Sequence, residues 1–133
     1  MTDDDKKTEI TMSDRRPIRI VQSDWPIIAT ANRSDDLNKP RACAPLAAGR
    51  ETRIMVREHK DGRRVVSGVQ QWSNGEPPNS WRDLKGGMLI GAQSDGKPDE
   101  DKTIHAIRYV AGVVQDYRLA DECIADMPAE DLS

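Results

Sequence analysis

The sequence predicts an α+β fold, with an antiparallel four- to five-stranded sheet and two C-terminal helices packed on one face. Three observations predict it. Residues 53–69 resemble a β-hairpin, short β-branched segments lie on either side of it, and the apolar period changes from two to about 3.6 after residue 98. At 133 residues the chain fits one domain. We expect a flexible N-terminal arm over residues 1–14 and a single α+β domain over residues 15–131.

The first strands are expected soon after the arm. Residues 18–21 alternate partly between apolar and charged side chains, as strands do. Residues 25–31 form a second strand, in which Pro26 suits a strand start or a sheet edge because its missing N–H does no harm there. Residues 32–49 combine turn formers and small residues without a sustained period, which predicts a long loop.

The hairpin is the most informative local pattern. Its arms, residues 53–58 and 63–69, are rich in β-branched residues and flank Lys60, Asp61 and Gly62. An Asp-Gly pair is favoured at hairpin turns because both residues tolerate positive φ. Residues 70–87 follow as a second irregular segment, and residues 88–92 are a short apolar run typical of a buried strand.

The C-terminal third is expected to be helical. Ile104, Ile107, Ala111 and Val114 fall at spacings of three and four, which predicts an amphipathic helix over residues 99–114. The acidic start of this segment suits the positive end of the helix dipole. A shorter helix is expected over residues 117–125, with Pro128 ending it.

The sequence carries no catalytic motif. It has two histidines, His59 and His105, and it lacks a nucleophile elbow, a zinc-protease helix, a phosphate-binding glycine loop and a Cys-x-x-Cys pair. Cys43 and Cys123 are interpreted as small apolar residues that stay reduced in a cytosol. We therefore expect a non-enzymatic protein with no catalytic residue, no cofactor and no metal ion. The short apolar runs predict neither a membrane span nor a signal peptide, hence a cytoplasmic protein.

Charge divides the chain and suggests a first binding surface. Residues 95–133 hold four basic and ten acidic side chains, whereas residues 15–86 are mildly basic. An acidic surface can occupy a site that normally holds nucleic-acid phosphates. The structural alternative is that these charges start helices and keep the surface solvated. The candidate protein-binding residues of this acidic face are Asp99, Glu100, Asp101, Asp116, Asp121 and Glu122.

The hairpin suggests a second, alternative surface, which would bind nucleic acid. Basic side chains there would contact phosphates and nearby tryptophans would stack on bases. The structural alternative is that the basic residues protect a sheet edge from pairing with another sheet. The tryptophans would then pack in the core or anchor a loop, because the chain has no Phe to do so. The candidate residues are Arg57, Lys60, Arg63, Arg64, Trp72 and Trp81.

Four segments of the chain, residues 13–18, 24–29, 56–64 and 107–114, resemble a family of small bacterial proteins. We associate the pattern with phage, prophage and other mobile elements of proteobacteria. The resemblance covers most of residues 13–131 and departs at the loops over 32–49 and 70–87. It brings no catalytic motif. Small proteins of mobile elements often act by binding a host machine, and anti-CRISPR inhibitors are one such group.

These observations together predict a mobile-element binding protein of the bacterial host cytoplasm. We expect it to inhibit a defence complex of the CRISPR-Cas type by occluding a nucleic-acid-binding surface. Its partner would then be a host or defence-system protein complex, with no membrane involved. The alternative is a small nucleic-acid-binding accessory protein that uses the basic hairpin. A further alternative is a homodimer that forms through the sheet edge at residues 25–31.

Overall fold

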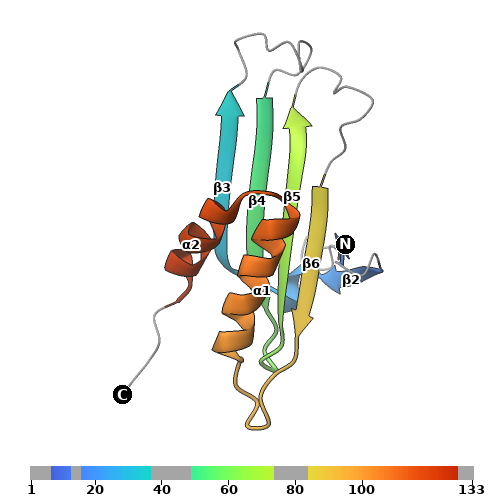
Figure 1. The fold of residues 1–133 in the computed structure, drawn as a ribbon. Coiled ribbons are helices and arrows are strands. Elements are labelled where there is room, and N and C mark those ends of the chain that lie inside the picture. Colours follow the sequence, from blue (N-terminus) through green and yellow to red (C-terminus); the bar gives the residue numbers. More distant parts are fainter. Residues whose placement is uncertain (1–6, 13–15, 37–48, 74–83, 129–133) are drawn as a thin grey trace.

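The computed structural model describes residues 7–12, 16–36, 49–73 and 84–128 (Figure 1). A four-stranded antiparallel sheet runs in simple sequence order from β3 to β6, and β1 and β2 form a separate antiparallel pair. Two helices follow the strands, as the sequence predicts. The elements are β1 (Lys7–Thr11), β2 (Pro17–Val21), the 3-10 helix η2 (Gln22–Asp24), β3 (Ile27–Asp36), β4 (Gly49–Glu58), β5 (Arg64–Ser73), β6 (Leu84–Ile90), α1 (Glu100–Val113) and α2 (Tyr117–Asp126).

The predicted hairpin is confirmed as the β4–β5 connection. The backbone N–H of Gly62 donates to the carbonyl of His59 at 2.9 Å, and the N–H of His59 donates to the carbonyl of Arg63 at 2.8 Å. Gly62 has a φ of 93°, which favours glycine. Asp61 does not take a positive φ. The Asp-Gly pair therefore marks the turn through its glycine, while the aspartate contributes by its side chain.

The strands extend beyond their predicted ends. Residues 32–36 and 49 belong to the predicted loop but continue β3 and β4, and β4 also includes residues 50–52, which lie before the predicted hairpin arm; the pairing stays in register from Asn32 opposite Arg53 to Asp36 opposite Gly49. β5 continues to Ser73, and β6 begins at Leu84 instead of residue 88. Antiparallel ladders are held by backbone hydrogen bonds, so polar segments without an apolar period can complete them. Residues 37–48 and 74–83, the rest of both predicted loops, lie outside the described residues.

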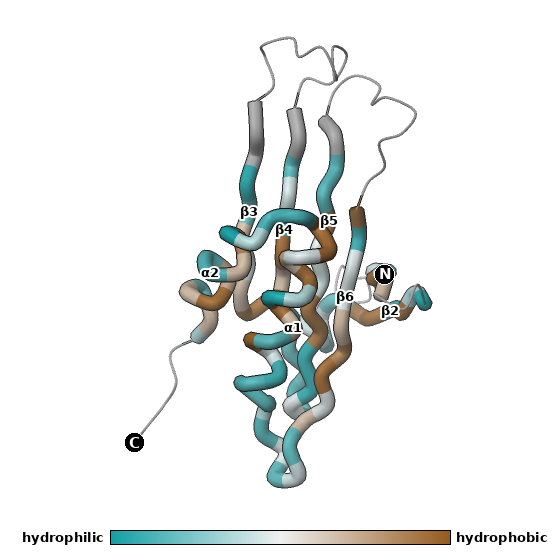
Figure 2. Tube along the Cα trace, in the orientation of Figure 1, coloured by the Kyte–Doolittle hydropathy of each residue, from teal (hydrophilic) through white to brown (hydrophobic). Residues whose placement is uncertain are grey.

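The helices cover one face of the four-stranded sheet and create the main core. α1 packs on β5 and β6, and α2 packs on β3. Ile54, Val56 and Val66 of the sheet and Ile107 and Val110 of α1 are fully buried in this layer. Figure 2 shows hydrophobic segments of the strands behind the helices and hydrophilic residues along much of the helices' length. The expected packing of both C-terminal helices on the sheet is confirmed.

A smaller layer lies on the opposite face of the sheet. Val65 alternates with the core residue Val66, so its side chain points away from the helices. It packs in a second buried cluster with Ile10, Ile20 and Trp25. The prediction of a flexible arm is therefore wrong for residues 7–11, because they pair with β2 and bury Ile10. Residues 1–6, 13 and 14 of that arm lie outside the described residues.

The outer edge of β3 is shielded by α2. The backbone N–H of Thr30 donates to Oδ2 of Asp126 at 2.8 Å, which satisfies a donor that another strand would otherwise use. Thr30 belongs to residues 25–31, the sheet edge through which the sequence analysis considered a possible homodimer. The structure gives that homodimer no support, because α2 occupies the edge.

Candidate interaction surfaces

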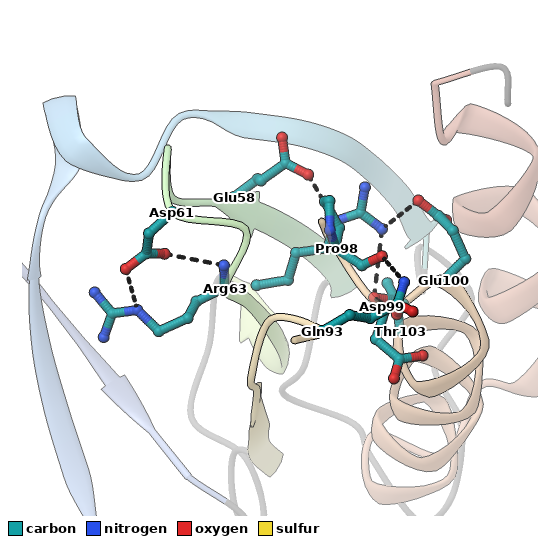
Figure 3. A network of polar contacts seen from close by, with 9 residues as sticks. Glu58, Asp61, Arg63, Gln93, Pro98, Asp99, Glu100 and Thr103 are labelled. Atoms are coloured by element: carbon teal, nitrogen blue, oxygen red, sulfur yellow. Dashed lines mark hydrogen bonds and ion pairs between the residues drawn. The ribbon is translucent and has the colours of Figure 1, made fainter. Parts of the chain in front are cut away.

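Two of the six predicted acidic residues hold the start of α1. Asp99 is the N-cap, and its Oδ1 accepts a hydrogen bond from the backbone N–H of Lys102 at 3.1 Å. Oε1 of Glu100 lies 2.9 Å from Nη1 of Arg64. N-cap carboxylates satisfy amide donors that have no partner within the helix. Both carboxylates therefore stabilise the start of α1, and Figure 3 shows Glu100 within the polar network there.

Arg64 is the centre of this polar network instead of part of a basic surface. Only 4% of the residue is exposed. Its Nε donates to Oε1 of Glu58 at 2.8 Å, and its Nη1 donates to Oγ1 of Thr103 at 3.4 Å, in addition to the pair with Glu100. A buried cation needs such partners to offset its lost hydration. The network ties the end of β4 and the start of β5 to α1 (Figure 3).

Asp116 is likewise used within the fold. It precedes α2, its side chain is only 9% exposed, and its Oδ2 lies 3.0 Å from Nη1 of Arg33 on β3. The pair joins the α1–α2 connection to the sheet on the side where α2 packs. Asp116 is therefore a poor candidate for direct contact with a partner.

The remaining three acidic residues are exposed but lie in two places. Asp101, Asp121 and Glu122 form no ion pair with any other described residue. Asp101 borders a hollow between α1 and β6, together with Leu89 and His105. Asp121 and Glu122 lie on α2, which packs at the β3 side of the sheet. The six predicted residues thus do not form one continuous acidic face.

The outer surface of the helix layer exposes both tyrosines of the chain, which the sequence analysis did not select. Tyr109 is 49% exposed and Tyr117 is 72% exposed. A Cβ added to Gly112 of α1 would lie 3.2 Å from Oη of Tyr117, so the Tyr117 ring rests against that glycine. The sequence could have indicated this exposure, because both tyrosines lie outside the row of apolar residues that each helix turns toward the core.

The basic hairpin is also divided by the structure. Lys60 and Arg63 are exposed at the turn, but Nε of Arg63 lies 2.7 Å from Oδ2 of Asp61 and its guanidinium lies 5.1 Å from the Trp25 ring centroid. The backbone N–H of Arg63, with smaller effects from its side chain, lowers the pKa of Asp61. Asp61 thus stays charged and offsets the positive charge of the turn.

Arg57 points to the opposite face from Arg64. It is 8% exposed, and its Nη1 donates to the backbone carbonyl of Trp25 at 3.0 Å. Burial lowers the pKa of Arg57. The side chain of Trp72, which lies in β5, and the whole of Trp81 fall outside the described residues. Of the four predicted nucleic-acid-binding residues whose side chains the structure describes, Arg57 and Arg64 are buried, and only Lys60 and Arg63 are exposed together at the turn.

Within the part of the chain that the structure describes, the histidines and the other metal-binding residue types do not gather at one place. His59 lies in the hairpin turn, with its ring centroid 5.0 Å from that of Trp25, and His105 lies on α1. Across residues 7–12, 16–36, 49–73 and 84–128, no three His, Cys, Asp or Glu side chains are placed to share a metal ion. None of the described helices has the length and apolar character needed to cross a membrane.

Comparison with known proteins does not indicate a function. No protein-family model, no curated protein and no solved structure matches the chain. A function must therefore be inferred from the exposed side chains and from the charges that the fold leaves unpaired.

Proposed function

We propose that this chain is a non-enzymatic binding protein of a mobile element that attaches to a bacterial defence-system complex through the outer surface of its helix layer. In this proposal it inhibits the complex by covering a nucleic-acid-binding surface. The contact surface consists of Tyr109, Tyr117, Asp121 and Glu122, and we call it the helix surface. Of the predicted acidic face it retains only the two exposed carboxylates of α2, to which it adds the two tyrosines.

The exposure of both tyrosines is the observation that carries the proposal. The chain has no Phe and only 4% aromatic residues, yet Tyr109 and Tyr117 lie outside the core. Tyrosine is enriched at protein interfaces and among the residues that dominate binding energy, because it combines a large apolar area with a hydroxyl and few rotatable bonds. Gly112 gives the Tyr117 ring a flat backbone surface to rest on, which limits the entropy lost on binding.

Charge supports a basic partner surface. Asp121 and Glu122 are neighbours on α2, both are exposed, and neither forms an ion pair with a described residue. Exposed carboxylates beside an aromatic anchor speed association with a positively charged partner and select against acidic ones. A protein surface that normally holds nucleic-acid phosphates has this positive charge. The resemblance to mobile-element proteins supports a defence complex as the owner of that surface.

The first experiment is an affinity pull-down from a bacterial lysate, split into nuclease-treated and untreated halves. A stoichiometric defence-system protein that stays bound after nuclease treatment is the expected result. The double variant Asp121→Lys and Glu122→Lys should then lose this partner, because it changes the local charge from −2 to +2. Tyr117→Ala should weaken binding roughly thirtyfold, as truncation of an interface hot spot of about 2 kcal/mol does.

The matched control is Asp101→Lys. Asp101 is an exposed carboxylate in the first turn of α1, at the hollow beside β6 and away from α2, so this change should leave binding intact. Equal loss in the control and the double variant would mean that net charge, and not the helix surface, sets affinity. Recovery that depends on nucleic acid would contradict the proposal and favour the exposed hairpin residues Lys60 and Arg63.

A further inference from the structure

A groove lies between strand β1 and the sheet face that the helices do not cover. Its volume is about 240 Å³. This is slightly below the ~300–1,000 Å³ of sites for drug-sized ligands, so it suits a smaller molecule. β1 forms one wall, and side chains of β4, β5 and β6 form the floor. Its main side chains are Ile10, Arg53, Met55, Arg57, Ser67 and Lys85.

Arg57 lines this groove and is a buried cation that has no carboxylate partner among the described residues. Its only hydrogen bond to a described residue runs from Nη1 to the carbonyl of Trp25, and no described Asp or Glu forms an ion pair with it. Its Nε is buried and has no acceptor. A buried charged donor that lacks a partner is unfavourable, and arginines in such places usually meet an anion. Arg57 also lines the groove, so a ligand that fills the groove meets a guanidinium whose buried Nε still lacks an acceptor.

The other charges of the groove add to this positive potential. Arg53 and Lys85 stand in one row across the sheet, because each pairs with Val69 of β5. Arg53 is oriented by Oδ1 of Asn32, which accepts from its Nε at 2.7 Å, and its Nη2 lies 3.7 Å from Oε1 of Glu51, which partly offsets its charge. Lys85 forms no ion pair with a described residue. The acidic lining residue, Glu9, lies 3.7 Å from Arg19 and is partly neutralised there.

We propose that this groove binds a small elongated organic acid, whose carboxylate accepts hydrogen bonds from the Nε edge of Arg57. The body of the ligand lies on Ile10, Met55 and Ser67. A second acidic group, where the ligand has one, lies near Arg53 and Lys85. Arg57 and Arg53 are four residues apart on one strand, hence about 13 Å apart along it.

The chemistry of the lining favours a carboxylate over a phosphate. One guanidinium edge matches the two oxygens of a planar carboxylate, and Arg–carboxylate pairs are often bidentate in this way. Phosphate sites usually combine several backbone N–H groups or a helix N-terminus, and no described helix begins at this groove. Apolar groups beside Arg57 give the ligand a hydrophobic contact that a bare inorganic anion cannot use. This site is independent of the helix surface.

The test is a titration of 15N-arginine-labelled protein with suberate, a linear dicarboxylate, observed through the Nε–Hε NMR signals. The Arg57 signal, identified by its loss in Arg57→Lys, should move saturably to lower field, because its proton gains a carboxylate acceptor. The Arg63 signal should not move. Octanoate, which has one carboxylate, should bind more weakly than suberate because it lacks the contact with Arg53 and Lys85.

A second variant keeps the test decisive if Arg57 variants do not fold. Ser67→Leu fills the groove and leaves Arg57 in place, so suberate affinity should fall at least about tenfold. Arg63→Lys, at an exposed arginine outside the groove, serves as the control and should bind like the unmodified protein. An Arg57 signal that ignores suberate, or that responds equally to sulfate at the same ionic strength, would overturn the proposal. So would unchanged binding in Ser67→Leu.

Discussion

Two consecutive arginines at the hairpin show how strand geometry decides the role of a single residue. Arg63 is exposed and pairs with Asp61, whereas Arg64 is 4% exposed and joins Glu58 to Glu100. Side chains alternate between the faces of a strand, so neighbours in sequence lie in different environments. A cluster of charges in the sequence therefore did not become a cluster on the surface. The same rule separates Arg57 from Arg64.

The first residue-level prediction distinguishes fold charges from surface charges at the start of α1. Asp99→Ala should lower the free energy of unfolding by about 1 kcal/mol, because the Lys102 amide loses its capping acceptor. Asp101→Ala, two residues later and exposed, should change it by less than about 0.5 kcal/mol. Urea denaturation measures both values. Equal losses would mean that the negative charge, and not the cap, stabilises the helix.

Cys123 provides a second residue-level prediction. Burial, with a smaller effect from the Asp126 carboxylate, raises the pKa of its thiol from 9.0 to about 11. In the unfolded chain the thiol loses its proton at lower pH, so the unfolded state binds fewer protons above pH 9. Stability should therefore fall between pH 9 and pH 11, by up to about 2 kcal/mol.

Thermal unfolding across this pH range measures the effect, with Cys123→Ala as the control in a Cys43→Ser background. The control should lack this component of the pH dependence. A thiol reagent at pH 8 should also label Cys123 only as fast as the native protein opens, since the thiol is fully buried and protonated. Labelling at the rate of a free thiol would contradict this account.

At the scale of elements, the sequence predicted the helices, which have an apolar period, and missed the strand segments that are stabilised by pairing with neighbouring strands. α1 and α2 lie within one residue of their predicted ends, because spacings of three and four define an amphipathic helix. The polar ends of β3 and β4 were missed because their stability comes from the ladder. β1 was missed although Ile10 and Met12 alternate with polar residues, since five residues give little signal.

The contact between α1 and β5 gives an element-level prediction. A Cβ at Gly68 would lie 2.5 Å from Cγ1 of Val110 and 3.2 Å from Cγ1 of Val114. Gly68→Ala should therefore push α1 away from the sheet and lower the free energy of unfolding by roughly 1–3 kcal/mol. Gly91→Ala is the matched control, because a Cβ there meets nothing within 4 Å. Chemical denaturation of both variants measures the difference, and similar values would exclude close packing as the cause.

At the scale of the whole molecule, one sheet carries two layers that differ in size. The helix layer buries Ile54, Ile107 and most of the apolar side chains, whereas the β1–β2 layer buries Ile10, Ile20 and Trp25 against Val65. Both candidate sites follow from this arrangement. Neither could be predicted completely, because the helix surface depends on which way two tyrosines point and the groove depends on where β1 lies.

The two layers should differ in stability. Ile10→Ala removes packing only from the smaller layer, so hydrogen exchange should speed up in β1 and β2 while the amides of α1 keep their protection. Ile107→Ala should speed exchange everywhere and cost about 2–5 kcal/mol, because it creates a cavity in the main core. Native-state hydrogen exchange resolves the two cases. Equal acceleration of α1 in Ile10→Ala would show that both layers unfold together.

The hydrogen bond from Thr30 to Asp126 also bears on how the protein avoids polymerising. A fibre that grows by strand addition needs an open edge at each end of every copy. Here α2 obstructs the β3 edge at Thr30, whereas no described strand pairs with the outer edge of β6. Two copies joined through β6 would each present a β3 edge that is obstructed at Thr30, which disfavours further strand addition. A single carboxylate on α2 thus helps to terminate assembly before it becomes aggregation.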